Sequence, residues 1–287
     1  MSYVILTDAA CDLYAGLCGQ SETGFIPMEY SLGNEMRSCV PPEAPETMKL
    51  FYNGQRKGEL TRTSQISPME YETAMVPWLE KGYSILYLAL SSGLSSTYNT
   101  ACMTAGQLLE RYPGLEIVCV DTLSATGGMG ILMERAMRNR TQGLSLHENA
   151  SDLNEAIRHI RHWFLVQDLM YLQRGGRVSM AAAAMGTVLH IHPILKIDPI
   201  GKLQTIGKER GVHKAIRTLM DHYTESCDPS SSDPVYVLDA DAPETGNALE
   251  EKLLAFNPDL TIRRCTLSPV IGAHTGPGMA AIVHIGK

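Results

Sequence analysis

Hydroxyl side chains gather where an apolar stretch of the chain is followed by an amphipathic one. Residues 83–90 (YSILYLAL) are typical of a buried strand, and residues 99–111 carry apolar side chains at helical spacing. The segment between them, SSGLSSTY at 91–98, holds five Ser and Thr hydroxyls. The unpaired N–H groups and partial positive charge of a helix start favour an anion, such as a carboxylate or phosphate. We expect Ser92 or Ser95 to cap this helix, and capping alone is the structural alternative.

Two further hydroxyl-rich junctions follow the same pattern. Residues 61–68 (TRTSQISP) lead into a helix for which Ser67 and Glu70 predict a capping box. Residues 121–130 (DTLSATGGMG) follow another apolar run. Loops that leave parallel strands and enter helices meet at one edge of a sheet, where ligands bind. The candidate donors at this edge are Thr63, Ser64, Ser92, Ser95 and Ser124.

Composition limits the class of protein. The 287 residues carry a formal net charge of -7, which argues against a nucleic-acid-binding surface. Seven scattered cysteines include no C-x-x-C pair, so we expect free thiols and neither a disulfide framework nor a metal site. We see no signal peptide and no apolar stretch long enough to span a membrane, and therefore expect a soluble, cytoplasmic protein.

The first half of the chain alternates strands and helices, which predicts a mostly parallel sheet. Pro77 should kink or divide one of these helices. The expected strands lie at 3–7, 24–31, 35–40, 83–90 and 115–120, and the expected helices at 46–53, 67–81, 99–111 and 129–141.

The pattern changes near residue 143, and the second half is expected to hold helices and a hairpin before a closing β-α-β unit. His159 and His162, with their neighbouring arginines, read as a solvated basic face on a helix. We expect helices at 146–162, 179–190, 208–226 and 243–256, and strands at 163–167, 193–198, 202–207, 235–238, 260–267 and 279–285. The predicted fold is α/β with two α/β domains. Residues 1–145 would form a mostly parallel sheet flanked by helices, and residues 146–287 a mixed sheet with helices.

Short motifs are spread in order over nearly the whole chain. They are LTDAACDL at 6–13, TSQ at 63–65, SSGLSSTY at 91–98, DTLSATGGMG at 121–130, LQRGGR at 172–177, PIL at 193–195, RG at 210–211 and GAHTGPG at 272–278. Together they resemble the DegV family of bacterial fatty-acid-binding proteins. The chain departs from the family pattern at Ser96 (usually glycine), Thr122 (usually serine) and His192 (usually lysine). Because of these departures, the preferred acyl chain is left open, and so is the possibility that the ligand is not a plain fatty acid.

The resemblance implies two α/β domains with a long-chain fatty acid buried between and within them. It implies a carrier with no active site and no cofactor of its own. A separate ATP-dependent fatty acid kinase would phosphorylate the carboxylate, and the acyl phosphate would feed phospholipid synthesis. Transient contact with a membrane is compatible with this role. Acyl chain length, unsaturation and oligomeric state are left open.

Five further residues are candidates on this reading. His274 and Thr275 would join the hydroxyl-rich loops as carboxylate ligands, and the alternative for His274 is a structural role in a glycine-rich turn. Arg174, Arg177 and Arg210 flank turns in an otherwise acidic protein and would face the kinase partner or attract the carboxylate. The alternative for each arginine is a solvated loop position.

Two other functions compete with the carrier. A serine hydrolase would use a serine of the 91–98 loop with His274 and with Asp8 or Asp121, but no G-x-S-x-G motif is present. An enzyme for a phosphate-bearing sugar or nucleotide would use the same loop. The glycines of 127–130 form neither a Walker A motif nor a dinucleotide fingerprint, so we expect them to serve tight packing.

Overall fold

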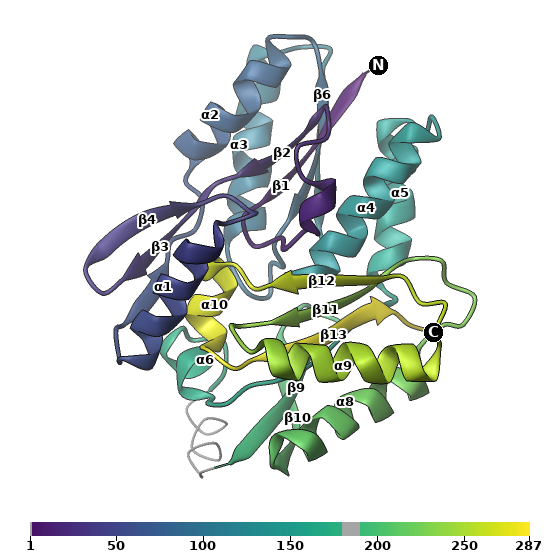
Figure 1. Ribbon diagram of the computed structural model, residues 1–287. Coiled ribbons are helices and arrows are strands. Elements are labelled where there is room, and N and C mark those ends of the chain that lie inside the picture. Colours follow the sequence, from purple (N-terminus) through teal and green to yellow (C-terminus); the bar gives the residue numbers. More distant parts are fainter. Residues whose placement is uncertain (1, 180–189) are drawn as a thin grey trace.

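A computed structural model of the chain describes residues 2–179 and 190–287. Two main sheets, each with its helices, and a small third sheet make up these residues (Figure 1). The predicted α/β class, with a parallel N-terminal sheet and a mixed C-terminal sheet, is confirmed. The alanine-rich helix predicted for 179–190 lies outside the described residues, apart from its two end positions.

The N-terminal main sheet is parallel throughout, in the order β2-β1-β6-β7. Every residue of β1 and β6 is buried, as is typical of parallel strands with helices on both faces. Helices α2 and α3 cover one face, and α4 and α5 cover the other (Figure 1). The bounds are β1 (Tyr3–Asp8), β2 (Thr23–Ile26), β6 (Ser84–Ala89), β7 (Ile117–Asp121), α2 (Pro68–Leu79), α3 (Thr97–Arg111), α4 (Gly127–Thr141) and α5 (Leu146–Ile157).

The small sheet is antiparallel, in the order β4-β3-β5. Its strands are β3 (Met28–Leu32), β4 (Glu35–Cys39) and β5 (Thr61–Thr63), and α1 (Pro45–Arg56) packs against β3. The single strand predicted at 24–31 is wrong, because β2 and β3 belong to different sheets. Pro27 separates them, and its missing N–H prevents a continuous ladder at that point. A short 3-10 helix, η1 (Ala15–Leu17), lies between β1 and β2.

The C-terminal main sheet has the order β10-β9-β8-β13-β11-β12, and only the β11–β12 pair is parallel. Helices α8 and α9 pack on it, whereas the short helices α6 and α10 pack against each other beside the small sheet. The bounds are β8 (Ile160–Leu165), β9 (Ile191–Ile197), β10 (Leu203–Arg210), β11 (Val235–Asp239), β12 (Ile262–Thr266), β13 (Ala280–Ile285), α6 (Met170–Arg174), α8 (Val212–Ser226), α9 (Pro243–Phe256) and α10 (Pro269–Thr275).

Three expectations for the second half are corrected. The helix predicted to reach residue 162 ends at Ile157, and β8 follows it. Burial alternates along the first residues of β8, which is the period of a strand, so His162 is buried rather than part of a solvated face. Arg210 ends β10 instead of opening a helix. The first four residues of the segment 272–278 belong to helix α10, not to a loop.

Helix α4 is shared by the two main sheets. It contacts β1 and β6 on one side and β8, β11 and β13 on the other. Its first turns are glycine-rich, and side chains of the C-terminal main sheet approach them closely. A Cβ added at Gly127 or Gly130 would lie 2.7 or 2.8 Å from Tyr236, and one at Gly128 would lie 2.3 Å from His162 Nε2. The tight packing expected of these glycines therefore involves the second sheet.

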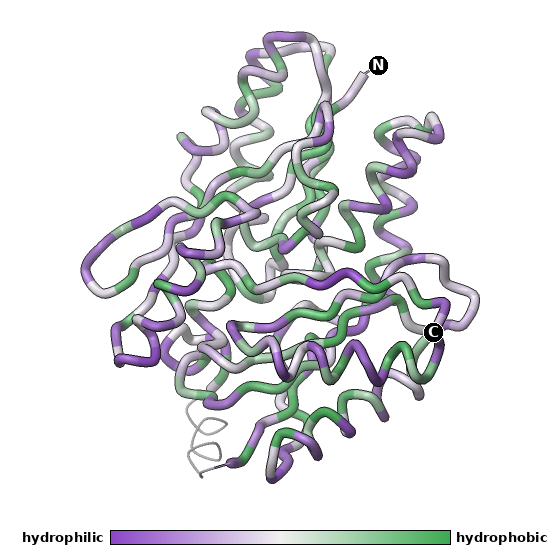
Figure 2. The backbone as a smooth tube through the Cα atoms, viewed as in Figure 1, coloured by the Kyte–Doolittle hydropathy of each residue, from purple (hydrophilic) through white to green (hydrophobic). Residues whose placement is uncertain are grey.

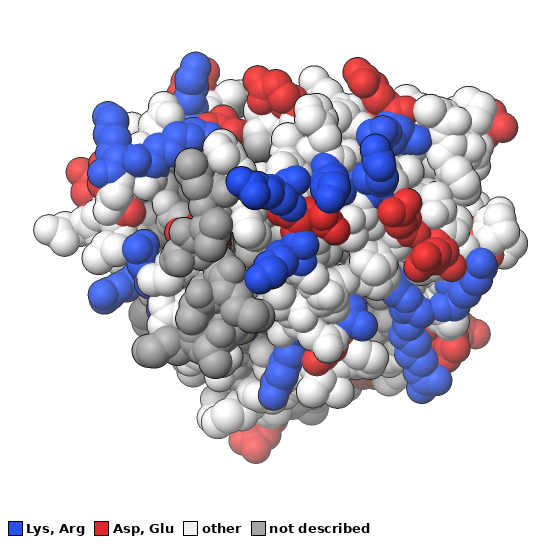
Figure 3. Space-filling model, turned by 90° about the horizontal axis from the view of Figure 1, so that it is seen from below, with Lys and Arg blue, Asp and Glu red and all other residues white. Residues whose placement is uncertain are grey.

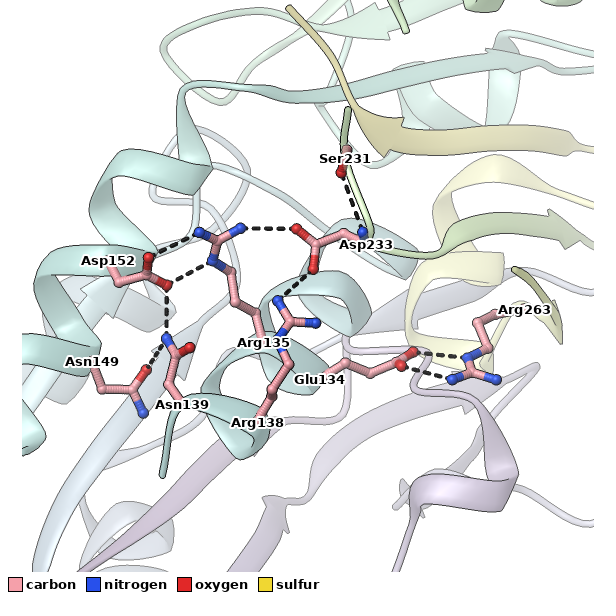
Figure 4. Close-up of polar contacts among 9 residues, drawn as sticks. All are labelled: Glu134, Arg135, Arg138, Asn139, Asn149, Asp152, Ser231, Asp233 and Arg263. Carbon is pink, nitrogen blue, oxygen red and sulfur yellow. Dashed lines mark hydrogen bonds and ion pairs between the residues drawn. The ribbon is translucent and has the colours of Figure 1, made fainter. Parts of the chain in front are cut away.

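Ion pairs continue this connection on the outer half of α4 (Figure 4). Arg135 donates two hydrogen bonds to Asp152 of α5, at 2.6 and 2.9 Å, and a third to Asp233 before β11, at 2.8 Å. Only 4% of the Asp233 side chain is exposed. Glu134 accepts two hydrogen bonds from Arg263 of β12. Because paired arginine donors satisfy these carboxylates, α4 is tied to both halves of the chain.

Apolar residues follow the strands and the inner faces of the helices (Figure 2). A continuous core runs from β1 and β6 through α4 to Tyr236 and Leu238 of β11, so the two halves share buried apolar contacts. The chain passes from one main sheet to the other between α5 and β8. Among the described helices, none is long and apolar enough to cross a membrane.

Candidate functional site

A cavity of about 490 Å³ lies between the two halves of the chain. Hydroxyl-bearing loops line one part of it, and apolar side chains from the C-terminal sheet line another. The polar lining residues are Thr63, Ser64, Gln65, Ser92, Ser95, Ser96, Thr126, His162, Arg177, His274 and Thr275. The apolar lining residues include Met28, Leu90, Leu94, Phe164, Leu172, Ile197, Leu203, Val270, Ile271, Met279, Ala281 and Val283. Six of the seven predicted carboxylate ligands are brought together here.

The loop between β6 and α3 is held in place by its first serine. Ser91 is buried, and its Oγ donates to the Gly201 carbonyl at 2.8 Å and accepts from the Gly93 N–H at 3.1 Å. Gly93 packs so closely on the same turn that an added Cβ would lie 2.6 Å from the Gly201 oxygen. The Ser92 N–H donates to Asp121 at 3.0 Å. Ser91 therefore fixes the loop against the β9–β10 turn, while Ser92 lines the cavity.

Helix α3 starts at Thr97, two residues before the predicted stretch 99–111, but its cap is not one of the two predicted serines. Its N-cap is Ser96, whose side chain makes no capping hydrogen bond, so neither Ser92 nor Ser95 is the N-cap residue. Ser95 Oγ instead accepts from the Thr97 N–H at 3.3 Å and lies 2.8 Å from Thr97 Oγ1. The Ser96 backbone is already near-helical, with ψ at 3°, and this geometry does not suit a side-chain cap. The start of the 15-residue helix faces the cavity through these serines.

Thr63 and His274 form a direct polar contact at the cavity wall. Thr63 Oγ1 at the end of β5 lies 2.8 Å from His274 Nε2 in the last turn of α10. Burial lowers the pKa of His274 to about 4, and the positive charge of Arg177 contributes to this shift. His274 is therefore neutral near pH 7 and acts through hydrogen bonding rather than through charge. Its ring packs on Gly175, where an added Cβ would lie 2.3 Å from Nδ1.

Arg177 is the one charged side chain that lines this cavity within the described part of the chain. Its Nε and Nη2 donate to the Leu94 carbonyl at 3.0 and 2.9 Å, and its Nη1 donates to the Gly175 carbonyl. Burial lowers the pKa of Arg177, but a guanidinium stays protonated in proteins. The cavity consequently has a fixed positive charge beside the Thr63–His274 pair.

The remaining predicted residues lie elsewhere. Ser124 is buried and belongs to the lining of a different cavity. Arg174 is exposed, with its guanidinium 5.6 Å from the centre of the Tyr171 ring. Arg210 is exposed at the end of β10. Arg177, which the sequence analysis assigned to the partner surface, is half-buried at the cavity wall, because the Leu94 and Gly175 carbonyls hold its side chain there.

Several lining residues were not identified from the sequence. His162 and Phe164 come from β8, where burial alternates in the structure although the residues IRHWFL do not alternate between apolar and polar types. Leu203 and Ile197 face each other in the β9–β10 hairpin, which the sequence did predict. Their role depends on which face of the hairpin meets the N-terminal loops, and no local pattern indicates that face.

The hydrolase geometry is not formed. Among the described residues, His274 has Thr63 as its hydrogen-bond partner and no serine hydroxyl. Asp8 is buried beneath the loops, where it accepts from Tyr87 OH at 2.9 Å and from the Leu90 N–H at 2.8 Å. Nor do the described residues contain a His, Cys, Asp and Glu cluster suited to a metal ion. The geometry instead offers an anion-binding end joined to an apolar wall.

Fold and cavity define an α/β protein that can hold an amphipathic ligand between two sheets. The family model "Uncharacterised protein, DegV family" matches residues 2–287. A DegV domain-containing protein of Clostridium perfringens is 33% identical over 285 residues, which cover 99% of this chain and 97% of the relative. The chain therefore belongs to the DegV family.

Solved structures agree with this assignment. One described as "Fatty Acid Binding of a DegV family Protein from Thermus thermophilus" is 26% identical, with a TM-score of 0.86 over 100% of both chains. The Streptococcus pneumoniae Fatty Acid Kinase (Fak) B3 protein, solved loaded with linoleic acid, has a TM-score of 0.88 over 100% of both chains. Its identity to this chain is 19%, so the likeness concerns the fold.

The neutral state of His274 predicts a pH effect on stability. Its folded pKa of about 4 is below the ordinary value of 6.5, so the unfolded chain binds this proton more readily. The stability that neutral His274 contributes is fully present above pH 6.5 and is lost as the pH falls toward 4. Between about pH 6.5 and pH 4.5 the free energy of unfolding should decrease in both proteins. The decrease should be about 2 kcal/mol larger in the parent than in His274→Gln.

Urea unfolding of both proteins at the two pH values measures this difference. Burial raises the pKa of Asp8 to about 6 and that of Asp12 to about 7, and both favour folding as the pH falls. These carboxyls are common to both proteins, so their contribution cancels in the comparison. Equal losses in the two proteins would show that His274 is not held neutral.

Proposed function

We propose that this protein binds a long-chain fatty acid in the cavity between its two halves. The observation that carries the proposal is the lining itself, in which one half-buried cation and a set of hydroxyls adjoin an apolar wall. A carboxylate needs several hydrogen-bond donors when it leaves water, and a nearby positive charge stabilises it further. The acyl chain needs only apolar surface. Relatives in the same family are described as binding fatty acids, which supports the proposal.

The carboxylate would lie where β5, α10 and the β6–α3 loop meet. Thr63, Ser92 and Ser95 would donate hydroxyl hydrogen bonds, and neutral His274 would donate from Nε2 to Thr63 Oγ1, which leaves the Thr63 hydroxyl hydrogen for the carboxylate. Ser64 and Thr275 line the same part of the cavity as further donors. Arg177 would supply the counter-charge. The preformed contacts of Arg177 and Ser91 with loop backbone mean that little reorganisation is needed on binding.

The acyl chain would run along the C-terminal sheet. Phe164 of β8 and Ala281 of β13 are paired in register and face the cavity together with Met279. Burying roughly 14 methylenes at about 0.8 kcal/mol each contributes on the order of 11 kcal/mol before the costs of association. In this proposal residues 1–145 and 146–287 act as two domains with the ligand at their interface.

The protein would then act as a carrier in the cytoplasm rather than as an enzyme. Its sequence has no nucleotide-binding motif, so a separate kinase would supply the phosphoryl group. One carboxylate oxygen would attack the γ-phosphorus of ATP, releasing ADP and leaving an acyl phosphate for phospholipid synthesis. The fold likeness to a fatty acid kinase B3 protein is consistent with such a partner.

The first test is the lipid that accompanies the purified protein. The large apolar burial should make dissociation slow, so we expect extraction and mass spectrometry to find fatty acid at close to one molecule per chain. Delipidated protein should take up oleate. Protein that carries no acyl species and takes up neither oleate nor palmitate would contradict the proposal.

A second test separates the carboxylate from the chain. Thr63→Val keeps the side-chain shape and removes the hydroxyl, so oleate should bind about tenfold to a hundredfold more weakly, since hydrogen bonds to charged groups contribute about 1.5–3 kcal/mol. The affinity for oleyl alcohol, which has no charge, should decrease much less. Competition binding with both ligands measures the ratio.

Thr61→Val is the matched control in the same strand. The Thr61 hydroxyl bonds Gln55 and the Ala273 carbonyl, so this change can lower stability but should leave the acid-to-alcohol ratio unaltered. Equal losses of acid and alcohol in Thr63→Val would exclude Thr63 as a carboxylate ligand.

A third test concerns the kinase surface. Figure 3 shows Lys and Arg side chains spread over the end of the molecule formed by β10, α8 and α9. Exposed Arg210 ends β10, and exposed Lys214 lies in the first turn of α8, where the helix dipole disfavours a cation, so a function for these two residues is plausible on this surface. We expect Arg210→Ala to bind oleate normally but to slow acyl phosphate formation severalfold in a reconstituted kinase assay. Arg174→Ala should act in the same direction.

Arg111→Ala is the control, because Arg111 is exposed and pairs with Glu72 on the far helices. Its turnover should match the parent's. Full turnover with Arg174 and Arg210 both replaced would move the docking surface elsewhere. Turnover by this chain with ATP alone would overturn the carrier function.

A further inference from the structure

A buried chain of hydrogen bonds runs beneath the β6–α3 loop. Asp8 ends β1, Tyr87 lies in β6 and Tyr71 lies in α2, and none of the three is exposed. The Leu90 N–H donates to Asp8 Oδ2 at 2.8 Å, and the Tyr71 hydroxyl donates to the Thr97 carbonyl at 3.0 Å. The chain therefore reaches the last residue before the loop and the first residue after it.

The contacts in this chain require more hydrogens than its two tyrosines supply. A carbonyl can only accept, so the Tyr71 hydrogen points to Thr97. The Tyr87 oxygen lies 3.0 Å from the Tyr71 oxygen and 2.9 Å from Asp8 Oδ2, but Tyr87 has one hydrogen for these two contacts. With Asp8 ionised, one of the two contacts joins oxygen lone pairs with no hydrogen between them.

A proton on Asp8 completes the chain. Asp8 then donates to Tyr87, and the Tyr87 hydroxyl donates to Tyr71. The protonated oxygen of the carboxyl keeps a lone pair for the Leu90 N–H, and the other oxygen accepts a backbone N–H at 3.0 Å. Every contact in the chain then has its own hydrogen, so the geometry favours the neutral acid.

The surroundings of Asp8 also favour the neutral acid. Burial raises the pKa of Asp8 to about 6. The titratable groups that face it are Tyr87 from β6, Tyr71 from α2 and Cys11 from the segment after β1. Burial raises the pKa of each of these three groups, so they stay uncharged near pH 7. Strand β2 places Ile26 beside Asp8, and none of the described basic side chains pairs with it.

The charge of Asp8 bears on the proposed ligand. Ser92, one of the proposed carboxylate donors, follows Leu90 by two residues, so an ionised Asp8 would place a negative charge on the inner side of the carboxylate-binding loop. Two like charges in a buried region repel each other, and protonation of one relieves the repulsion. Carboxylate binding and Asp8 protonation should therefore favour each other, because such linkage is reciprocal.

We propose that Asp8 is a positioning residue that holds a proton beneath the β6–α3 loop while an anionic head group is bound above it. Its neutral acid fixes both ends of the loop through Tyr87 and Tyr71, and keeps a negative charge away from the ligand. This inference rests on the proposed function and makes carboxylate binding proton-linked. The affinity for an anion should be highest at low pH and should decrease as Asp8 ionises.

The test compares three ligands of equal chain length. Palmitate carries a carboxylate, hexadecanesulfonate carries a charge that does not titrate, and hexadecanol carries none. Between about pH 6 and about pH 8.5, the affinity for the sulfonate should decrease about threefold to tenfold, and the affinity for hexadecanol should change less than about twofold. Palmitate should follow the sulfonate. Asp8→Asn cannot ionise, so its affinity for the sulfonate should stay constant over the same range.

A second variant tests whether the tyrosines hold the proton. Tyr71→Phe frees the Tyr87 hydrogen for an ionised Asp8, so the decrease in affinity should move to a pH lower by about half a unit to one unit. Tyr3→Phe is the matched control at the other end of β1, because its hydroxyl bonds the Leu144 carbonyl and a side chain of α5. That change can lower stability but should not move the pH dependence.

Infrared spectroscopy measures the same proton without a ligand. A protonated carboxyl has a carbonyl stretching band that a carboxylate lacks, and the band of Asp8 is the one lost in Asp8→Asn. Its titration should give a lower pKa in Tyr71→Phe than in the parent, whereas Tyr3→Phe should match the parent.

Two other groups ionise in the same pH range. A hydrogen bond with Cys119 lowers the pKa of Cys102 in α3 to about 6, and burial raises the pKa of Asp12 to about 7. Cys102→Ala should keep the pH dependence of the parent. Asp12 is retained in Asp8→Asn, so the constant affinity expected of that variant also excludes Asp12 as the source.

The outcomes separate this inference from the proposed function. A sulfonate affinity that is independent of pH, or that varies equally in the parent and in Asp8→Asn, overturns the inference and leaves the carrier standing. An unchanged or raised Asp8 pKa in Tyr71→Phe overturns it as well. Failure of every anion to bind contradicts the proposed function, and the infrared titration then still decides whether Asp8 holds the proton. If Asp8→Asn does not fold, the shift in Tyr71→Phe decides.

Discussion

The close approach of two sheets to helix α4 is the constraint on which the rest of the structure depends. Gly127 and Gly130 allow Tyr236 of the mixed sheet to reach the helix backbone, and Gly128 does the same for His162. On its other side α4 packs on the parallel sheet. Because the helix begins at the loop edge of that sheet, the hydroxyl-rich loops are brought against the apolar face of the second sheet. The cavity is the space left between them.

The loops keep their shape through backbone contacts rather than through the ligand. Ser91 joins the β6–α3 loop to the Gly201 turn, and Arg177 joins the same loop to the segment after α6. Such contacts reach residues far away in the chain, so each loop is positioned by the opposite half. The result is a preformed site in which a half-buried cation lies beside a neutral histidine, and carboxylate binding would require little rearrangement.

Much of this could be predicted from the sequence, because local signals were strong. Apolar runs marked β1 and β6, and the capping box at Ser67 marked the start of α2. The hydroxyl-rich loops meet at one edge, as the parallel pattern predicted. What could not be predicted depends on long-range contacts. The half-buried position of Arg177 depends on the Leu94 carbonyl, 83 residues away in the chain.

Other differences had a local signal that competed with a stronger one. Pro27 marked the break between β2 and β3, but the apolar residues around it suggested one strand. His162 was assigned to a basic face because two arginines and another histidine surround it, whereas β8 buries it by pairing with β13, which the residues IRHWFL do not indicate. Ser124 was grouped with the other hydroxyls, yet the turn at Thr126 places it beneath the loop, beside His162.

The most direct measurement of the central claim is a crystal structure of the protein with bound oleate. We expect the carboxylate within hydrogen-bond distance of Thr63 Oγ1 and close to Arg177, with the acyl chain running past Phe164. An empty cavity with oleate bound elsewhere would contradict it. So would a reversed ligand, with its carboxylate at His162 and its methyl end among the serines.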